Sequence, residues 1–65
     1  MDSKKLKIAM LEAGINVTNL AKEVGFTRAS FYNKLSGKHK FKKSEKLVIA
    51  SVLDLNEEQL KEIFG

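Results

Sequence analysis

Apolar residues recur along the chain every three or four positions, which is the spacing that places side chains on one face of an α-helix. Glycines and short polar residues divide this pattern into segments. It predicts five short helices, at about residues 3–13, 17–25, 28–36, 45–53 and 57–64. Proline is absent, so no strong helix breaker interrupts the pattern. The sequence therefore favours a compact all-α fold, with a single domain over residues 1–65.

The predicted helix ends depend on capping residues. Five N-caps are expected, because short polar side chains accept hydrogen bonds from the free amides of a first turn: Asp2 or Ser3, Asn16, Thr27, Ser44 and Asn56. Gln59, three residues after Asn56, completes a capping box. Gly14 and Gly25 are expected to end the first two helices. Residues 38–43 lack a helical period and are predicted to form a loop held by Phe41.

One face of each predicted helix is expected to form the core. Its members are Leu6, Ala9, Met10, Ala13, Ile15, Leu20, Val24, Phe31, Leu35, Ile49, Ala50, Leu53, Leu60, Ile63 and Phe64. Leu47, Val48 and Val52 widen the apolar stripe of the fourth helix beyond this face. We expect an exposed patch for weak self-association, with Val48, Val52 and Phe64 as dimer contacts. The equally weighted alternative is that a small core uses all of these side chains.

The segment Val17–Ser36 has the features of two helices that cross at a tight turn. Ala21 places a small side chain where the helices must approach closely, and Gly25 suits a turn that needs a positive φ. Three bulkier side chains are expected to fill the space between the helices: Leu20, Val24 and Phe31. This arrangement is typical of a DNA-binding helix-turn-helix, in which the second helix lies in the major groove.

The chain carries a net charge of +4, and its charges are unevenly distributed. Between positions 28 and 46 Glu45 is the only acidic residue, against Arg28, Lys34, Lys38, Lys40, Lys42, Lys43 and Lys46. Positions 54–65 instead carry Asp54, Glu57, Glu58 and Glu62 against Lys61. Such a field attracts a polyanion to one face. The alternative, a merely solvated lysine run, is less favoured because the run directly follows the predicted recognition helix.

Several functional classes are disfavoured by composition. Cysteine is absent and His39 is the only histidine, so neither a disulfide nor a metal site is expected, and no cofactor is implied. No serine or carboxylate pair surrounds His39 at a recognisable catalytic spacing, which argues against an enzyme. No apolar run approaches the roughly 20 residues that span a bilayer, and no signal peptide is evident. We expect a cytoplasmic protein that does not bind membranes.

Three short motifs occur in order along the chain. They are LAKEVG at 20–25, followed by Thr27, Arg28 and Ser30; LSGK at 35–38; and LDLN at 53–56. In these motifs the chain resembles the lambda-repressor-like and Cro-like family of phage and bacterial helix-turn-helix proteins. The resemblance covers nearly the whole chain. It implies a compact five-helix DNA-binding domain in which the second and third helices form the helix-turn-helix.

The resemblance also implies roles for particular residues. Side chains at the start of the third helix read base edges in this family, which implies Arg28 and Ala29, with Asn33 one turn further on. Groups at the start of the second helix and after the third helix hold phosphates. The backbone-binding residues expected from this pattern and from the lysine run are Asn16, Thr27, Tyr32, Lys34, Lys38, Lys40, Lys42 and Lys43.

The chemistry of the base-reading residues suggests what each contacts. Arg28, one residue past an N-cap, is expected to point out along the helix axis and to bind guanine O6 and N7; the alternative is a phosphate. Ala29 offers a methyl group to thymine or simply allows close approach. Asn33 grips adenine or remains solvated. Tyr32 reaches a phosphate or a sugar, or else forms a half-buried edge of the core.

Three positions depart from the family pattern. Many members carry glutamine at the position of Val17, where it braces the first recognition residue and touches a phosphate. Many also carry glutamine at the position of Arg28, so a different base preference is expected. Some members pair an arginine with a glutamate where this chain has Met10 and Leu35. Packed hydrophobic residues replace a buried ion pair without loss of the fold.

Together these features predict a sequence-specific transcriptional regulator of double-stranded DNA, of the type of a Cro-like phage repressor. One domain covers about half of a palindromic operator, so a weak homodimer is expected. The alternative is a phage regulatory modulator that acts by binding a partner repressor.

Overall fold

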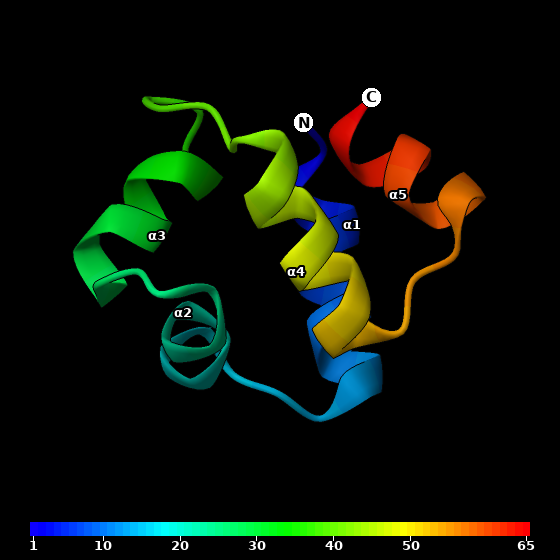
Figure 1. Ribbon diagram of the computed structural model, residues 1–65, viewed down its shortest axis with the longest axis horizontal. Helices are drawn as coiled ribbons and strands as arrows, with labels where there is room; N and C mark the ends of the chain where they lie inside the picture. The colour runs from blue at the N-terminus through cyan, green and yellow to red at the C-terminus, as the bar shows by residue number, and fades with distance from the viewer.

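The computed structural model describes residues 1–65 and consists of five helices without strands. They are α1 (Ser3–Ala13), α2 (Val17–Val24), α3 (Arg28–Leu35), α4 (Lys43–Leu53) and α5 (Glu57–Phe64). The predicted all-α architecture is confirmed. Helix α4 lies at the centre, with α2 and α3 on one side of it and α5 on the other (Figure 1). None of the helices has the length and apolar character needed to cross a bilayer.

Most of the predicted helix caps are present. Asn16 Oδ1 accepts a hydrogen bond from the Asn19 amide at 2.8 Å, and Thr27 Oγ1 accepts one from the Ser30 amide at 3.1 Å. Asn56 and Gln59 form the expected reciprocal capping box, at 2.8 and 3.0 Å. Asp2, rather than Ser3, caps α1. Because these bonds satisfy amides that a first turn leaves free, the sequence defines the starts of these helices locally.

The predicted N-cap of α4 is wrong. Ser44 lies within the first turn, and the helix begins at Lys43 with Lys42 at the N-cap position. A lysine side chain has no hydrogen-bond acceptor, so it cannot cap the helix as serine does. Instead, the Glu45 carboxylate accepts a hydrogen bond from the Lys42 amide at 2.6 Å. The carboxylate in the first turn thus replaces the expected cap and starts the helix earlier.

The core is entirely apolar. Its buried members are Leu6, Met10, Leu20, Ala21, Phe31, Leu35, Phe41, Ile49, Leu53 and Ile63. These include most of the residues predicted for the helix faces, and no polar residue belongs to this buried set. Ala13 is a correction, because it is exposed. It lies in the last turn of α1 and lines an open hollow beside Leu53 and Leu55, beyond the packed part of the helix.

Four phenylalanines from different parts of the chain pack together. Phe31 of α3 lies 6.1 Å from Phe26 of the turn and 5.9 Å from Phe41 of the loop, measured between ring centres. Phe41 in turn contacts Phe64 of α5 edge-to-face at 5.3 Å. Tilted and edge-on arrangements at these distances are favourable for aromatic rings. The cluster therefore ties the turn before α3 and the loop after it to the C-terminal helix.

The side chains expected at a dimer contact differ in exposure. Val52 and Phe64 are half-buried and pack against the core, as the small-core alternative requires. Leu47 and Val48 remain in solvent, with 54% and 38% of their surfaces exposed. The apolar excess of α4 is thus partly used inside the domain and partly left on its outer face.

A single ion pair joins α3 to α4. The Lys34 ammonium lies 2.9 Å from Glu45 Oε1, with both side chains mostly buried at 14% and 16% exposure. It also lies 3.4 Å from the Lys40 carbonyl oxygen and 4.6 Å from the centre of the Phe26 ring. Burial works against the charged form of Glu45. The hydrogen bonds from the Lys42 amide and from Lys34, with the two lysine charges, outweigh burial and hold the pKa of Glu45 below its ordinary value.

Truncation of Phe31 to alanine should abolish the cooperative fold. The ring is fully buried, and loss of a buried phenylalanine costs about 3–5 kcal/mol. That is comparable with the roughly 3–5 kcal/mol that a core of this size supplies. Urea denaturation followed by circular dichroism measures the loss. Leu11→Ala, at a side chain that is 80% exposed, is the control and should unfold like the wild type. A stable, cooperative Phe31→Ala protein would contradict the assigned role of the ring.

The stability of the domain should fall in acid because of Glu45. Its pKa is lower in the folded state, so its contribution is fully present above the ordinary glutamate pKa of about 4.5 and is lost as pH falls through the folded-state value. Glu45→Gln keeps an acceptor for the Lys42 amide but does not titrate. Between about pH 6 and about pH 3, the wild type should lose more unfolding free energy than this variant. Equal losses in urea titrations would refute the prediction, and Glu12→Gln, at an exposed position, is the control.

Candidate DNA-binding surface

The turn between α2 and α3 is short and hydrogen-bonded. Gly25 adopts φ 91°, and its amide bonds to the Ala21 and Lys22 carbonyls at 2.9 and 3.2 Å. The Phe26 amide bonds to the same Ala21 carbonyl at 2.8 Å. A left-handed residue with these bonds ends a helix and turns the chain sharply. Thr27 then caps α3, so the two helices are packed together as the sequence predicts for a helix-turn-helix.

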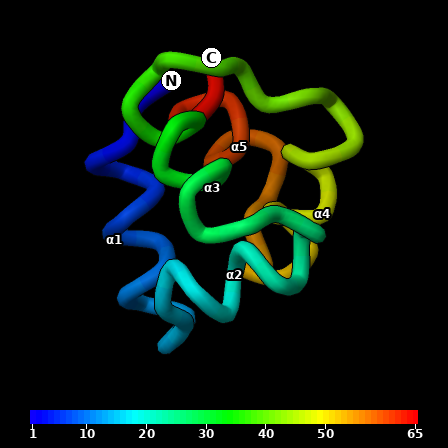
Figure 2. The backbone as a smooth tube through the Cα atoms, turned by 90° about the vertical axis from the view of Figure 1, so that its left-hand side faces the viewer, coloured from blue at the N-terminus to red at the C-terminus, as the bar shows by residue number.

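Helix α3 has one buried face and one exposed face. Phe31 and Leu35 point into the core, while Arg28, Ala29 and Tyr32 are exposed. Residues four positions apart share a strip of the helix surface, so Ala29 aligns with Asn33 and Arg28 with Tyr32. In Figure 2, α3 faces the viewer with α2 below it and no other helix in front. Of the predicted base-reading residues, Arg28 and Ala29 therefore lie on the open surface of this helix.

The Arg28 side chain points in a different direction from the one expected. Its guanidinium lies 5.7 Å from the centre of the Tyr32 ring, so the side chain lies across the outer surface of α3 rather than straight out beyond the helix end. The attraction between a cation and an aromatic face one turn away explains this direction. The sequence identified both residues but not their contact with each other.

Asn33 is half-buried near the end of α3. Its carbonyl accepts hydrogen bonds from the Ser36 hydroxyl at 3.0 Å and from the amides of Lys38 and His39 at 3.0 and 3.3 Å. The backbone of Asn33 thus ends the helix and fixes the beginning of the following loop. Its carboxamide forms no hydrogen bond within the chain, so its polar groups remain available to a ligand.

Asn16 and Thr27 lie at the starts of α2 and α3, where backbone amides with partial positive charge are concentrated. The Asn16 side-chain oxygen accepts the cap hydrogen bond, which leaves the side-chain nitrogen Nδ2 free to donate to a ligand. The Thr27 hydroxyl accepts from the Ser30 amide and donates to the Ser30 hydroxyl at 3.0 Å. Thr27 is therefore occupied by the cap, and its contribution to the surface is to fix the first turn of α3.

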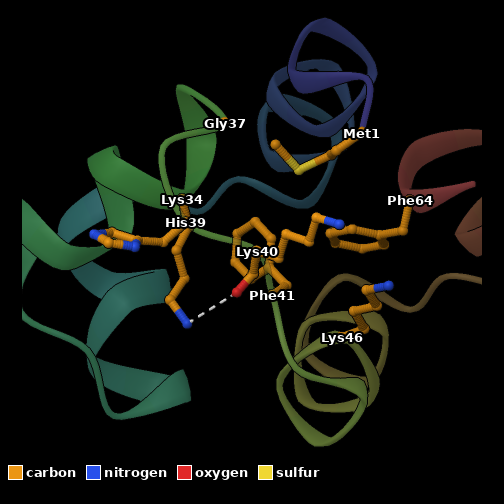
Figure 3. A pocket seen from close by; sticks show the side chains of 8 residues that line it. All are labelled: Met1, Lys34, Gly37, His39, Lys40, Phe41, Lys46 and Phe64. Carbon is orange, nitrogen blue, oxygen red and sulfur yellow. Dashed lines mark hydrogen bonds between the residues drawn. The ribbon is translucent and has the colours of Figure 1, made fainter.

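The lysines after α3 differ from Lys34. Lys38, Lys40, Lys42 and Lys43 are exposed and have no ion-pair partner, because the only ion pair in the chain is Lys34–Glu45. Figure 3 shows the Lys34 ammonium bonded to the Lys40 carbonyl, beneath the loop. Lys34 was expected to bind the DNA backbone, but it is held inside the domain between Glu45 and the aromatic rings. Sequence spacing could not reveal a partner 11 positions away.

A cleft of about 370 Å³ opens beside this loop. It is lined by Met1, Lys34, Gly37, His39, Lys40, Phe41, Lys46 and Phe64 (Figure 3). Lys46 projects over the Phe64 ring, with its ammonium 5.7 Å from the ring centre. His39 is exposed, as expected. Lys34, Lys40 and Lys46 are among its lining residues, so the cleft belongs to the basic part of the surface.

The sequence analysis missed one basic residue of this surface. Lys7 of α1 lines a hollow together with Ser3, Tyr32, Leu35 and Ser36. It therefore extends the positive surface from α3 onto α1. Its charge was visible in the sequence, but the side of α1 that faces α3 depends on how the helices pack.

The acidic residues of α5 lie away from this surface. Glu57 and Glu58 occupy the first turn of α5, and Glu62 follows on the same helix, all exposed. Helix α5 lies on the opposite side of α4 from α3 (Figure 1). The charge division along the sequence thus becomes a division in space, with a basic side around α3 and its loop and an acidic side at α5.

No group of histidine, cysteine, aspartate or glutamate side chains suitable for a metal ion is present. No curated protein and no solved structure matches the chain. The family model described as the Cro/C1-type HTH DNA-binding domain matches residues 5–64. This match agrees with the five-helix order and with the packed α2–turn–α3 unit, and it confirms the resemblance inferred from the motifs. The chain belongs to the Cro/C1-type helix-turn-helix family of DNA-binding domains.

Proposed function

We propose that the domain is a sequence-specific transcriptional regulator that reads the major groove of double-stranded DNA with α3. The observation that carries the proposal is the composition of the two faces of this helix. Phe31 and Leu35 fix it to the core, while Arg28, Ala29 and Tyr32 remain exposed beside a loop of unpaired lysines. The major groove is wide enough for an α-helix, and the lysines of the loop complement the negative phosphates at its edges.

Three residues are proposed to read bases. Arg28 donates two hydrogen bonds to guanine O6 and N7, because its planar fork matches these acceptors. Ala29 contacts a thymine methyl group and lets the helix approach the bases closely. Asn33, with an unbonded carboxamide, binds adenine N6 and N7.

The remaining polar groups are proposed to hold the sugar–phosphate backbone. Asn16 and the first amides of α2 contact one phosphate, and the amides of α3 behind Thr27 contact another. The Tyr32 hydroxyl reaches a phosphate at the edge of the groove. Four lysines supply the part of the affinity that does not depend on sequence: Lys38, Lys40, Lys42 and Lys43. Lys34 is left out of this set because Glu45 neutralises it.

A single domain of this size covers one half-site, so we propose that two copies bind a palindromic operator in the cytoplasm as a phage-type repressor. The exposed Leu47 and Val48 favour a contact through the outer face of α4, to which the half-buried Val52 and Phe64 are also proposed to contribute. The same exposed side chains favour a second candidate, a modulator that binds a partner repressor. Gel mobility shifts on regulatory DNA distinguish the two. A regulator shifts the DNA by itself, whereas a modulator gives no shift alone and removes the shift caused by the partner repressor.

Arg28→Ala should reduce the discrimination between the preferred duplex and random DNA. Loss of a bidentate guanine contact costs about 1–3 kcal/mol of discrimination. Competition titrations with both duplexes measure it. Lys22→Ala, a change of an exposed basic residue on α2 outside the proposed contacts, is the control. Equal losses on both duplexes would assign Arg28 to a phosphate instead of a base.

Lys40→Ala should weaken binding to all duplexes equally. Removal of one phosphate contact should also lower the slope of log affinity against log salt by about 1. Titrations at several salt concentrations measure both effects. Lys61→Ala, on the acidic side, should change neither affinity nor slope. A loss confined to the preferred duplex would show that Lys40 acts on sequence rather than on the backbone.

Val48→Glu should prevent cooperative binding of two copies. A twofold contact would place the introduced carboxylates close together, where like charges repel. Sedimentation of the protein with a two-half-site duplex should show two wild-type copies bound cooperatively and independent binding by the variant. Leu11→Glu, on the outer face of α1, should behave like the wild type. A strictly monomeric wild type on this duplex would refute the proposed dimer.

A further inference from the structure

The stack between Arg28 and Tyr32 is a contact within the surface that the sequence did not predict. The guanidinium lies 5.7 Å from the ring centre, within the range of a cation–π interaction. The two residues are four positions apart on α3, so the helix itself brings them together. Arg28 has no ion-pair partner in the chain that would draw it elsewhere.

The Tyr32 ring lies on the exposed side of α3. Its residue is 45% exposed, so part of its surface is covered by its neighbours. Tyr32 lines the same hollow of about 210 Å³ as Ser3 and Lys7 of α1 and Leu35 and Ser36 at the end of α3. The Tyr32 carbonyl also accepts a hydrogen bond from the Ser36 amide at 2.9 Å. The backbone of Tyr32 is thus fixed within α3, and its side chain lies beside a hollow that α1 also lines.

No other side chain in the structure is paired with the Arg28 guanidinium. The only ion pair in the chain is Lys34–Glu45, and the one cation–π contact of Arg28 is with Tyr32. Tyr32 is therefore the side chain that is in position to restrain Arg28.

We propose that Tyr32 is a positioning residue that holds Arg28 ready to bind a guanine in the major groove. The inference rests on the proposed DNA-reading function and adds to it the residue that sets the strength of guanine selection. An unsupported arginine loses side-chain freedom when it binds, whereas a stacked one has lost part of that freedom beforehand. An exposed contact of this kind corresponds to about a two- to fivefold change in an equilibrium constant.

A double-mutant cycle tests the inference. The wild-type chain selects a preferred duplex from a random pool, and affinities are measured for that duplex and for one in which adenine replaces its guanines. Tyr32→Leu should lower the ratio of the two affinities about two- to fivefold. Tyr32→Phe keeps the ring but loses the hydroxyl proposed to contact a phosphate, so it should weaken binding to both duplexes alike and leave the ratio unchanged. In an Arg28→Ala background, Tyr32→Leu should cause no further change in this ratio.

Two outcomes would overturn the inference while the proposed function stands. One is an equal change in the ratio with and without Arg28. The other is a change in Tyr32→Phe as large as in Tyr32→Leu, which would assign the effect to the hydroxyl. No binding of duplex DNA by the wild type would overturn the proposed function and the inference together.

A measurement without DNA tests the stack directly. The Arg28 side-chain N–H resonance should be displaced by the ring current of Tyr32 in the wild type and in Tyr32→Phe, and should return to its ordinary position in Tyr32→Leu. Circular dichroism confirms that each variant is folded. An undisplaced resonance in the wild type would show that the stack is absent in solution.

Discussion

The position of α3 depends on the packing of Phe31 beneath it. This ring contacts Phe26 before the helix and Phe41 after it, so one buried side chain fixes the turn, the helix and the loop together. The chain has no disulfide and no metal site to supply this rigidity by other means. In so small a domain, a recognition surface must be held by the same few contacts that hold the fold.

Glu45 compensates the positive charge of the partly buried Lys34 and also bonds to the first amide of the α4 cap. It starts α4 through the Lys42 amide and neutralises Lys34, the one lysine of the run that points into the domain. A buried ammonium without a partner would be strongly unfavourable. With this pair formed, Lys38, Lys40, Lys42 and Lys43 are left exposed on the loop between α3 and α4 and at the start of α4. The basic surface and the apolar core can therefore lie next to each other.

Local features of the sequence were sufficient to predict much of the fold and the general place of the site. The caps at Asn16, Thr27 and Asn56 and the turn at Gly25 involve residues within a few positions of each other, so their patterns are visible in the chain. The errors have different origins. Ser44 lost its expected role to Glu45, whose carboxylate accepts a hydrogen bond from the Lys42 amide three positions away and another from Lys34 of α3, 11 positions away. The direction of Arg28 follows from its contact with the Tyr32 ring one turn further along α3, a choice of side-chain conformation that residue spacing does not specify.

Because the Lys34 and Glu45 side chains are mostly covered, salt should weaken this ion pair less than it weakens the interactions of the exposed lysines. At physiological ionic strength the Debye length is about 8 Å, and exposed charges are screened far more than mostly buried ones. The loop lysines belong to the first group and the ion pair to the second. Concentrated salt should therefore release a bound polyanion while the domain stays folded. Lowering the salt concentration should then restore binding without a refolding step.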